Sequence, residues 1–199
     1  MALFGITSPL SSSPILRGED IYMRLPEMRD FEAWVDLREK SQAFLAQWEP
    51  IWPDDDFTRT SFRRRVRRHI IEAENEESLA FLIFRRTDNQ LVGGVTLGHI
   101  RRGVAQAATL GYWMGAPYAG QHYMSRAVRA LTQYSFGQLR LHRLEAACLP
   151  RNNASINLLK ATGFSQEGLA RSYLRIAGQW QDHLLFARLE NDPLPKSAP

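Results

Sequence analysis

Residues 107–164 contain the residue types and spacing in this chain that suit the binding of an anion. They include TLGYWMGAPYAGQHYMSRAVRAL from Thr109 and, after a short connection, HRLEAACLPRNNASINLLKATGF up to Phe164. The pattern predicts a strand over 107–114, a tight turn at Gly120 and a helix over 121–136. The first amides of a helix have no partner within it and lie at the positive end of its dipole. The turn is therefore predicted to bind an anion such as a pyrophosphate.

The predicted phosphate contacts are backbone groups of the turn and of the first helical turn. They belong to Gly120, Gln121, His122, Tyr123, Met124 and Ser125. Turns of this kind occur in many proteins, so the surrounding sequence has to decide what binds there.

A second strand is predicted over 143–149, and a second helix follows it. Asn152 and Ser155 lie where that helix begins. Both residue types are favoured at helix N-termini, where their side chains accept hydrogen bonds from free amides. They are candidates for helix capping, for contact with a ligand beside the strand, or for both.

The rest of the chain predicts one α+β domain over 19–190. Strands are expected at 21–25, in the pair SLAFLIF and LVGGVTLGHI, and in a closing hairpin that turns near Gly178. A helix is expected from about Arg29 to Glu39. The sum is a mixed, mostly antiparallel sheet of about seven strands with helices packed on it. Residues 1–18 are expected to form a flexible arm, and 191–199 a Pro-rich tail.

Composition excludes several classes of protein. The chain has 199 residues, 44% of them hydrophobic and 23% charged, which is typical of a globular protein. No apolar run approaches the ~20 residues that span a bilayer, and the first residues lack a basic signal-peptide region. We expect a cytoplasmic protein with no membrane contact. No metal is expected, since the histidines lack ligand spacing, and the single Cys148 is expected to be a buried structural thiol.

Basic residues are clustered between Arg59 and Arg68. On a helix, Phe62, Val66, Ile70 and Ala73 would make one apolar stripe and leave most of the arginines facing water. The three acids from Asp54 to Asp56 are candidates for capping this helix. The arginines form either a solvated face or a weak contact with a polyanion such as ribosomal RNA, or with an acidic protein.

Several motifs in order resemble the RimJ/RimL branch of the GNAT superfamily of N-acetyltransferases. The resemblance covers about residues 19–190, and its motifs are FLAQWEP, GYWMG, GQHYMSRAVRAL, NNAS, KATGF and GQWQD. It implies a GNAT fold whose sheet is splayed at the centre and has helices on both faces. It also implies acetyl-CoA as the acyl donor. Members of this branch acetylate the N-terminal amine of ribosomal proteins, and relatives acetylate other amines.

The resemblance assigns roles to individual residues. Backbone groups of Trp113 and Met114 would bind the pantetheine arm in place of a neighbouring strand and polarise the thioester carbonyl. Asn152 would hold the pantetheine, and Ser155 would return a proton to the leaving thiolate. Lys160 would approach the nucleotide phosphates or remain solvated. Gly111 is expected to form a bulge where the sheet splays, because glycine marks bulges and close backbone approach, with an ordinary strand glycine as the alternative.

Ala119 stands where the family's turn usually has a glutamine, and three further positions also depart from the family pattern. The turn normally has a second glycine where this chain has His122, so the side chain either crowds the phosphate or, when protonated, contacts it. Arg126 stands where an acidic residue is common, and Thr109 where many relatives have a glutamate. These departures favour one alternative, a non-catalytic module that binds acyl-CoA or the ribosome.

A neutral amine is needed for direct attack on the thioester. Roughly 10% of α-amines are neutral at pH 7, against about 0.04% of lysines, so an N-terminal acceptor needs only a weak base. Glu49 is the first candidate to steer the amine or accept its proton, and otherwise it is a solvated loop carboxylate. Asp182 and Tyr173 on the closing hairpin come next, with ordinary pairing within the hairpin as the alternative for both. Candidate walls of the acceptor pocket are Trp48, Trp52 and Trp180.

The sequence thus predicts an acetyl-CoA-dependent N-acetyltransferase that works by direct attack in a ternary complex, as a monomer or homodimer. Its predicted acceptor is the N-terminus of a protein, with ribosomal proteins as the first candidates. An acetyltransferase for a small amine is the other enzymatic alternative.

Overall fold

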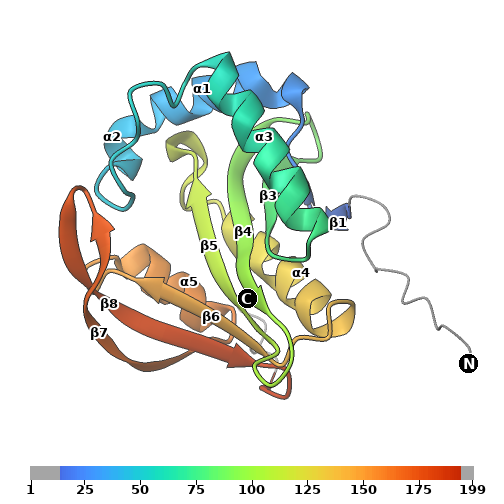
Figure 1. Cartoon of the computed structure of the whole chain (residues 1–199), viewed down its shortest axis with the longest axis vertical. Helices are drawn as coiled ribbons and strands as arrows, with labels where there is room; N and C mark the ends of the chain where they lie inside the picture. The colour runs from blue at the N-terminus through green and yellow to red at the C-terminus, as the bar shows by residue number, and fades with distance from the viewer. Residues whose placement is uncertain (1–13, 194–199) are drawn as a thin grey trace, which may run out of the picture.

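Eight strands form one mixed sheet in the computed structural model of the protein, which describes residues 14–193 (Figure 1). In sheet order β1-β2-β3-β4-β5-β6-β8-β7, all neighbours are antiparallel except the parallel pair β5–β6. The strands are β1 Leu16–Arg17, β2 Ile21–Arg24, β3 Leu79–Arg85, β4 Leu91–Arg101, β5 Ala107–Met114, β6 Arg143–Cys148, β7 Ser165–Ile176 and β8 Gln179–Leu189. The predicted α+β class and mixed sheet are confirmed. The eighth strand is β1, which lies inside the predicted arm and pairs with β2 of the domain.

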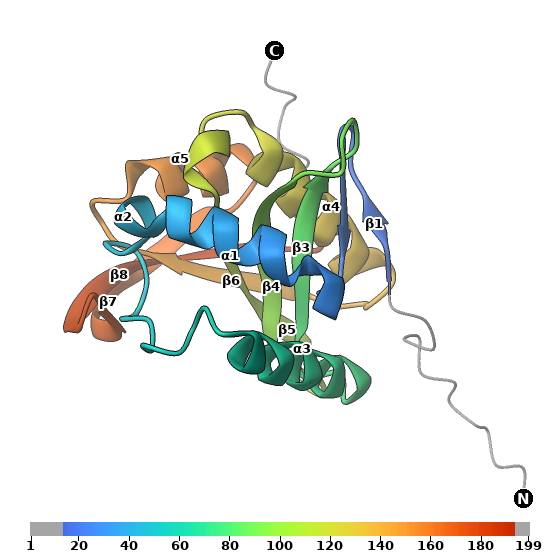
Figure 2. The same ribbon diagram turned by 90° about the horizontal axis from the view of Figure 1, so that it is seen from above.

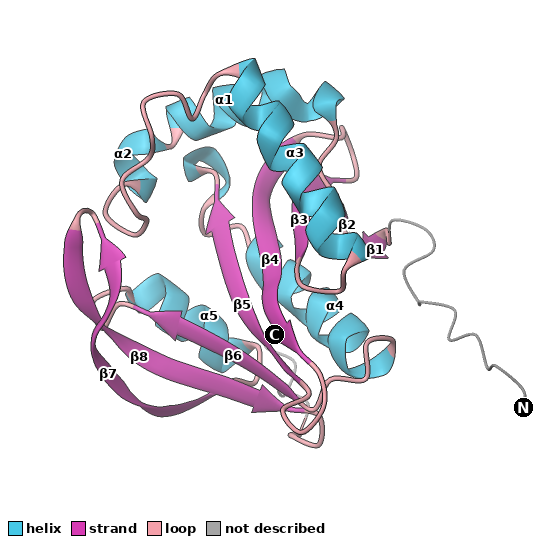
Figure 3. Cartoon of the chain, viewed as in Figure 1, coloured by secondary structure: helices cyan, strands magenta, loops and turns pink. Residues whose placement is uncertain are grey.

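Helices cover both faces of the sheet, as predicted. Figures 1 and 2 show α3 on one face over β3 and β4, and α4 and α5 on the opposite face, while α1 and α2 run across one end of the central strands. The helices are η1 Met28–Asp30, α1 Phe31–Lys40, α2 Gln42–Leu45, α3 Arg59–Glu74, η2 Ala116–Tyr118, α4 Tyr123–Gly137 and α5 Asn153–Ala161. Figure 3 shows how loops join these elements around the sheet.

The predicted arm (1–18) and tail (191–199) lie mainly outside the described residues. Within 14–193, each helix is too short or too polar to traverse a lipid bilayer. Over the same range, His, Cys, Asp and Glu side chains do not gather in any group of three that could hold a metal ion.

Two apolar clusters hold the helices on the sheet. On the α4 side, Ala127, Val128 and Leu131 are fully buried against the strands. On the α3 side, Phe62 and Val66 pack with residues of α1, β3 and β4. The predicted stripe on α3 is wrong at Ile70, which is 43% exposed. The spacing of buried positions 62, 66 and 73 turns the neighbouring His69 inward instead.

The parallel pair β5–β6 separates partway along its length. Pairing runs from Ala107 opposite Arg143 to Leu110 opposite Ala146, and then stops. Residues 111–114 of β5 and 147–148 of β6 therefore face each other across an unpaired stretch, called the gap below, and the predicted splay is confirmed. The predicted bulge at Gly111 is wrong, because Gly111 lies opposite Thr96 in regular register and the irregularity of this ladder falls between Gly98 and Arg101.

Candidate active site

The turn before α4 presents unpaired main-chain amides. Gly120 and His122 both have left-handed backbone, with φ of 76° and 63°, and both are exposed. Among residues 14–193, none of the six amides from Gly120 to Ser125 has a hydrogen-bond acceptor, whereas the amide of Arg126 donates to the His122 carbonyl at 3.2 Å. These six amides, called the amide turn below, sit at the positive end of the α4 dipole. They form a site suited to a phosphate or pyrophosphate.

Side chains of the amide turn mainly brace the turn itself. Gln121 Nε2 donates to the Pro117 carbonyl at 2.9 Å, and the Ser125 hydroxyl donates to the His122 carbonyl at 2.8 Å. Tyr123, Met124 and Ser125 are buried. Any phosphate contact from these three positions would have to be made by their amides.

The left-handed backbone explains what position 122 requires. Glycine adopts this conformation without strain, and histidine is among the side chains that tolerate it best. His122 is exposed, so its ring points away from the buried core. The departure from the family's glycine therefore keeps the geometry of the turn.

The other two departures, Arg126 and Thr109, both interact with nearby residues outside the gap. Arg126 pairs with Asp20 at 3.1 Å and with Glu19 at 3.4 Å, and its guanidinium lies 5.9 Å from the ring centre of Tyr123. Thr109 lies opposite Glu145 in the paired part of β5 and β6, before the gap begins. Neither residue blocks the gap.

Main-chain groups along the gap alternate in direction. The amide of Gly115 donates to the Val92 carbonyl at 2.9 Å, and Met114 lies opposite Gly93. In an antiparallel ladder such groups point alternately toward and away from the partner strand. The groups of Trp113 therefore point toward β4, whereas those of Tyr112 and Met114 point into the gap. Of the two residues predicted to bind a pantetheine arm, Met114 is the one whose amide faces the gap.

Two hydroxyls meet beside the gap. The Tyr112 hydroxyl on β5 lies 2.6 Å from Ser155 Oγ on α5. Burial raises the pKa of Tyr112 well above its ordinary value, so the phenol stays protonated and can donate. Cys148 at the end of β6 is buried, and burial raises the pKa of its thiol as well. The thiol therefore stays neutral at pH 7.

Asn152 caps α5, so the predicted capping role is confirmed for this residue. Its Oδ1 accepts from the Ser155 amide at 3.1 Å. This bond fixes the first turn of α5 and so holds Ser155 against Tyr112. Lys160 lies exposed near the other end of the same helix.

Tyr112 is the residue of this region that sequence reasoning missed. The sequence predicts contacts from the backbone of Trp113 and Met114 and assigns no role to Tyr112. The usable signal was alternation: if Trp113 faces one side of the sheet, Tyr112 faces the other, where the second helix packs.

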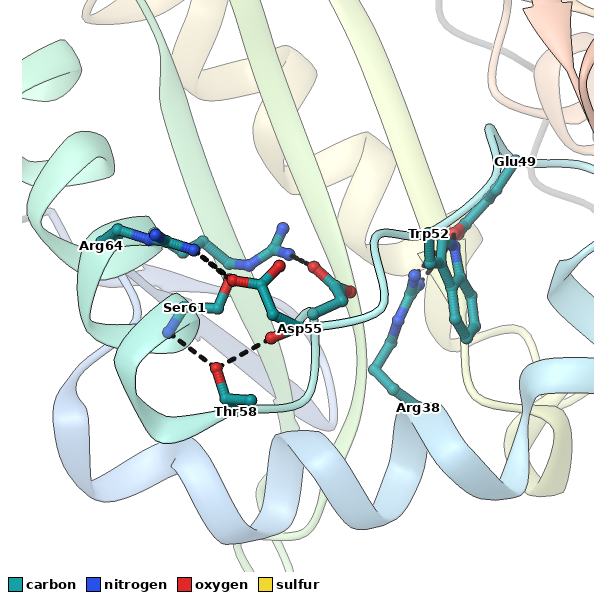
Figure 4. Close-up of polar contacts among 9 residues, drawn as sticks. Arg38, Glu49, Trp52, Asp55, Thr58, Ser61 and Arg64 are labelled. Atoms are coloured by element: carbon teal, nitrogen blue, oxygen red, sulfur yellow. Dashed lines mark hydrogen bonds and ion pairs between the residues drawn. The ribbon is translucent and has the colours of Figure 1, made fainter.

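On the opposite side of the sheet, Glu49 is held by three donors (Figure 4). Arg38 of α1 donates through both terminal nitrogens, at 2.9 Å to Oε1 and 2.6 Å to Oε2. Trp52 Nε1 donates to Oε2 at 2.7 Å. Glu49 is thus an ordered carboxylate with partners, and the alternative of a solvated loop side chain does not describe it.

A cavity of about 240 Å³ lies beside Glu49. It is bounded by α1, α3 and strands β3, β4 and β5. Its charged or aromatic lining residues are Trp34, Arg38, Glu49, Phe62, Arg65, His69, Phe81 and Trp113. Burial lowers the pKa of His69, so its ring is neutral at pH 7. The cavity combines aromatic walls with a carboxylate and reaches the end of β5 at Trp113.

The closing hairpin touches the same segment through its turn. The Ala177 amide donates to the Glu49 carbonyl at 2.9 Å. Arg151, just before α5, donates to the Gln47 carbonyl at 3.4 Å and to Gln181 on β8 at 3.3 Å. Residues 47–49 therefore bridge α2 and the tip of the β7–β8 hairpin.

Asp182 and Tyr173 are placed farther along this hairpin. Asp182 Oδ1 accepts from the Ser172 amide at 2.8 Å and so supports the irregular stretch of β7 between Ala170 and Leu174. Tyr173 is 48% exposed, with its ring 5.9 Å from that of His183. Among the predicted tryptophan walls, Trp52 contacts Glu49, Trp48 lies by Arg151, and Trp180 is 66% exposed.

The acids before α3 do not cap it as predicted. Thr58 is the N-cap, and its side chain accepts from the Ser61 amide at 3.2 Å (Figure 4). Asp55 and Asp56 instead pair with Arg64 and Arg65. Thr58 occupies the position directly before the helix, which the acids are too early in the chain to take.

Comparison with known proteins agrees with this geometry. Residues 20–165 match the family model described as the acetyltransferase (GNAT) domain. The chain is 37% identical to a probable N-acetyltransferase, YjcK, from Bacillus subtilis, with 89% of this chain and 98% of that protein covered. It is 30% identical to the ribosomal protein uS5-alanine N-acetyltransferase of Escherichia coli, with 90% and 93% covered.

A solved structure shares the fold and holds a relevant ligand. Mycobacterium smegmatis RimJ in complex with CoA-disulfide is 32% identical, with a TM-score of 0.82 and coverage of 89% of this chain and 86% of that chain. GNAT enzymes use acetyl-CoA, and the gap beside an amide turn suits such a donor. The chain therefore belongs to the GNAT acetyltransferase family and is an N-acetyltransferase of the RimJ/RimL type.

Proposed function

We propose that the protein transfers an acetyl group from acetyl-CoA to the N-terminal α-amine of a protein, by direct attack within a ternary complex. The observation that carries the proposal is the gap, where main-chain groups of β5 lie unpaired between the amide turn and the cavity at Glu49. Similarity to the uS5-alanine N-acetyltransferase makes a ribosomal protein the first candidate acceptor.

In this proposal the donor is bound largely by backbone. The pyrophosphate of acetyl-CoA would rest on the amides of residues 120–125, with Lys160 near its nucleotide end. The pantetheine arm would lie in the gap beside Asn152, and pair with the main-chain groups of Met114 and Tyr112. The Met114 amide would donate to the thioester carbonyl, whose oxygen gains negative charge during attack.

The chemical step needs proton transfers at two places. The neutral amine attacks the carbonyl carbon, and the carbon–sulfur bond breaks as the tetrahedral intermediate collapses. Ser155 would donate a proton to the departing thiolate, with Tyr112 donating to Ser155 Oγ and so leaving the serine hydrogen free to point at sulfur. The amine's extra proton passes to solvent or to a nearby carboxylate.

The acceptor would approach from the cavity side. Glu49 is the first candidate to attract the ammonium form and guide it to the thioester, since its carboxylate borders the cavity. An α-amine suits this site because a measurable share of it is neutral at pH 7, so a strong base is unnecessary. Asp182 and Tyr173 rank behind Glu49, because Asp182 supports β7 and Tyr173 is largely exposed.

The proposal also covers the partners of the protein and its location in the cell. A weak contact with ribosomal RNA would depend on Arg63 and Arg67, since Arg59, Arg64, Arg65 and Arg68 each pair with an acid. The proposed location is the cytoplasm, where ribosomal proteins are made, with the enzyme a monomer or homodimer.

Thiol release from acetyl-CoA tests the function directly. A peptide with a free N-terminal alanine is compared with the same peptide blocked at its amine, and with a panel of small amines. We expect release only with the free peptide. Release with small amines alone would show that the acceptor is not a protein N-terminus. Mass spectrometry of cellular N-termini with and without the gene would then identify the natural acceptor.

A further inference from the structure

Arg38 is a buried cation that joins the two sides of the proposed site. It is only 6% exposed and makes the bidentate pair with Glu49 already described. Its guanidinium carbon lies 4.1 Å from the ring centre of Trp52 and 4.9 Å from that of Trp113. These four residues, Arg38, Glu49, Trp52 and Trp113, are called the Arg38 cluster below.

The cluster connects three segments that are separate in the sequence. Arg38 belongs to α1, Glu49 and Trp52 to the loop between α2 and α3, and Trp113 to the end of β5. Trp113 immediately precedes Met114, whose amide faces the gap. A movement of the Trp113 ring would therefore shift the backbone that the thioester is proposed to meet.

The packing around Trp113 leaves it little freedom. A Cβ placed on Gly94, its partner on β4, would lie 2.4 Å from Trp113 Nε1. A Cβ on Gly115 would lie 2.4 Å from a methyl group of Leu37, one residue before Arg38. Glycine at these positions lets the indole lie flat on β4 and lets α1 approach the strand end closely.

Stability alone gives a weak reason for burying such a pair. Removing two charges from water costs about as much as their attraction returns, and apolar replacements of buried pairs are often neutral. The planar fork of arginine can, however, grip both carboxylate oxygens while its faces stack on aromatic rings, which a lysine cannot do. The arrangement therefore fits a need for fixed geometry.

We propose that Arg38 is a positioning residue that aligns the Glu49 carboxylate on the acceptor side with the end of β5 on the donor side. This inference rests on the proposed function and extends it, because it assigns the alignment of the two substrates to one side chain. Arg38 acts through Glu49 and Trp113, with no contact to the reacting atoms.

The structure supplies a matched control. Arg24 also makes a bidentate pair with a buried aspartate, Asp30, at 2.7 and 2.6 Å, and its guanidinium lies 4.4 Å from the ring centre of Phe84. Its side chain is 12% exposed. Arg24 therefore has the chemistry of Arg38 in a place that does not touch the Arg38 cluster.

The test compares Arg38→Lys with Arg24→Lys. With the free-alanine peptide, we expect Arg38→Lys to lower kcat/KM for the peptide at least tenfold more than Arg24→Lys does. The KM for acetyl-CoA should change less than about twofold in both, because the amide turn is untouched. Equal losses in the two variants would overturn the positioning role, since they would show a general effect of weakening a buried pair.

A second readout needs no acceptor. In two-dimensional amide NMR spectra, Arg38→Lys should shift the Met114 resonance and Arg24→Lys should leave it in place. An unmoved Met114 resonance in Arg38→Lys overturns the inference even if the acceptor is not the proposed one. Failure of the wild-type protein to acetylate any peptide would instead count against the proposed function, so the two failures are distinct.

Discussion

The two sides of the gap are built from different kinds of chemical group. On the donor side, the amide turn offers six main-chain N–H groups, and its side chains are either exposed or turned to bracing the turn. On the acceptor side, the Arg38 cluster and the neighbouring cavity depend on charged and aromatic side chains in fixed contact. Every residue except proline supplies a main-chain donor, whereas a guanidinium that contacts two indoles and a carboxylate has no substitute.

The difference teaches which parts of the site tolerate change. His122 replaces a glycine of the family pattern, and the turn keeps its left-handed geometry. GNAT enzymes use acetyl-CoA as donor, and a site of main-chain amides can bind its phosphates whatever the acceptor is. The acceptor differs among these enzymes, and the side chains that surround its proposed site are where that choice would be made.

The largest effect is expected at Gly94, where the backbone of β4 contacts the Trp113 side chain. Gly94→Ala would drive a methyl group into the Trp113 indole, 2.4 Å from Nε1. We expect a loss of about 1–3 kcal/mol in the free energy of unfolding, measured in urea, together with reduced peptide acetylation. Gly98→Ala on the same strand is the control, because its methyl group would meet nothing closer than 3.9 Å. Equal losses would mean that Trp113 is not tightly held.

The donor side should depend on one pair of side chains. Tyr112→Phe removes the hydroxyl that holds Ser155 at 2.6 Å. We expect kcat to fall about 10- to 100-fold, at the lower end of what general acid catalysis contributes, with the KM for acetyl-CoA unchanged. In a Ser155→Ala background, Tyr112→Phe should cause no further loss. An additive loss would show that the two hydroxyls act separately.

A pH-dependent effect is expected on the acceptor side. Burial lowers the pKa of His69 in the folded protein, so the unfolded chain binds a proton more readily. Stability is therefore lost as the pH falls through the ordinary histidine value of about 6.5. His69→Gln should reduce the difference in unfolding free energy between pH 7.5 and pH 5.5. An unchanged difference in His69→Gln would contradict the assignment.

The smallest effect is expected at the amide turn. His122→Gly should raise the free energy of unfolding by about 0.5 kcal/mol, since left-handed backbone costs an ordinary side chain about 1–2 kcal/mol and glycine loses part of that in entropy. Calorimetry should find the acetyl-CoA Kd within about twofold of wild type. His122→Ala keeps the strain and removes the ring, so weaker binding in both variants would reveal a contact between imidazole and phosphate.

Sequence patterns predicted the fold and the elements around the gap well because these depend on local signals. The strand over 107–114 has the predicted bounds, and α4 begins two residues after the predicted start. The family motifs surround the gap, where the pairing of β5 and β6 was expected to stop. Backbone sites of this kind are fixed by the order of strand, turn and helix, which a sequence displays directly.

The acceptor side was harder to predict from the sequence, because it depends on contacts between segments that are far apart in the chain. Arg38 belongs to no sequence motif. Its proposed role comes from its contacts with Glu49, Trp52 and Trp113. The wrong predictions at Ile70, Gly111 and Asp54–Asp56 have a common origin. Each assigned a residue by its type, while the observed helix phase, ladder register and N-cap depend on its neighbours.

The unpaired edges of β5 and β6 also have a consequence for the protein before it meets its donor. Exposed strand edges are templates for aggregation, and here two of them face each other in the middle of a sheet. A bound acyl donor would cover both and add to stability by mass action. The melting temperature should therefore rise with acetyl-CoA concentration, and the empty enzyme should be its most fragile form.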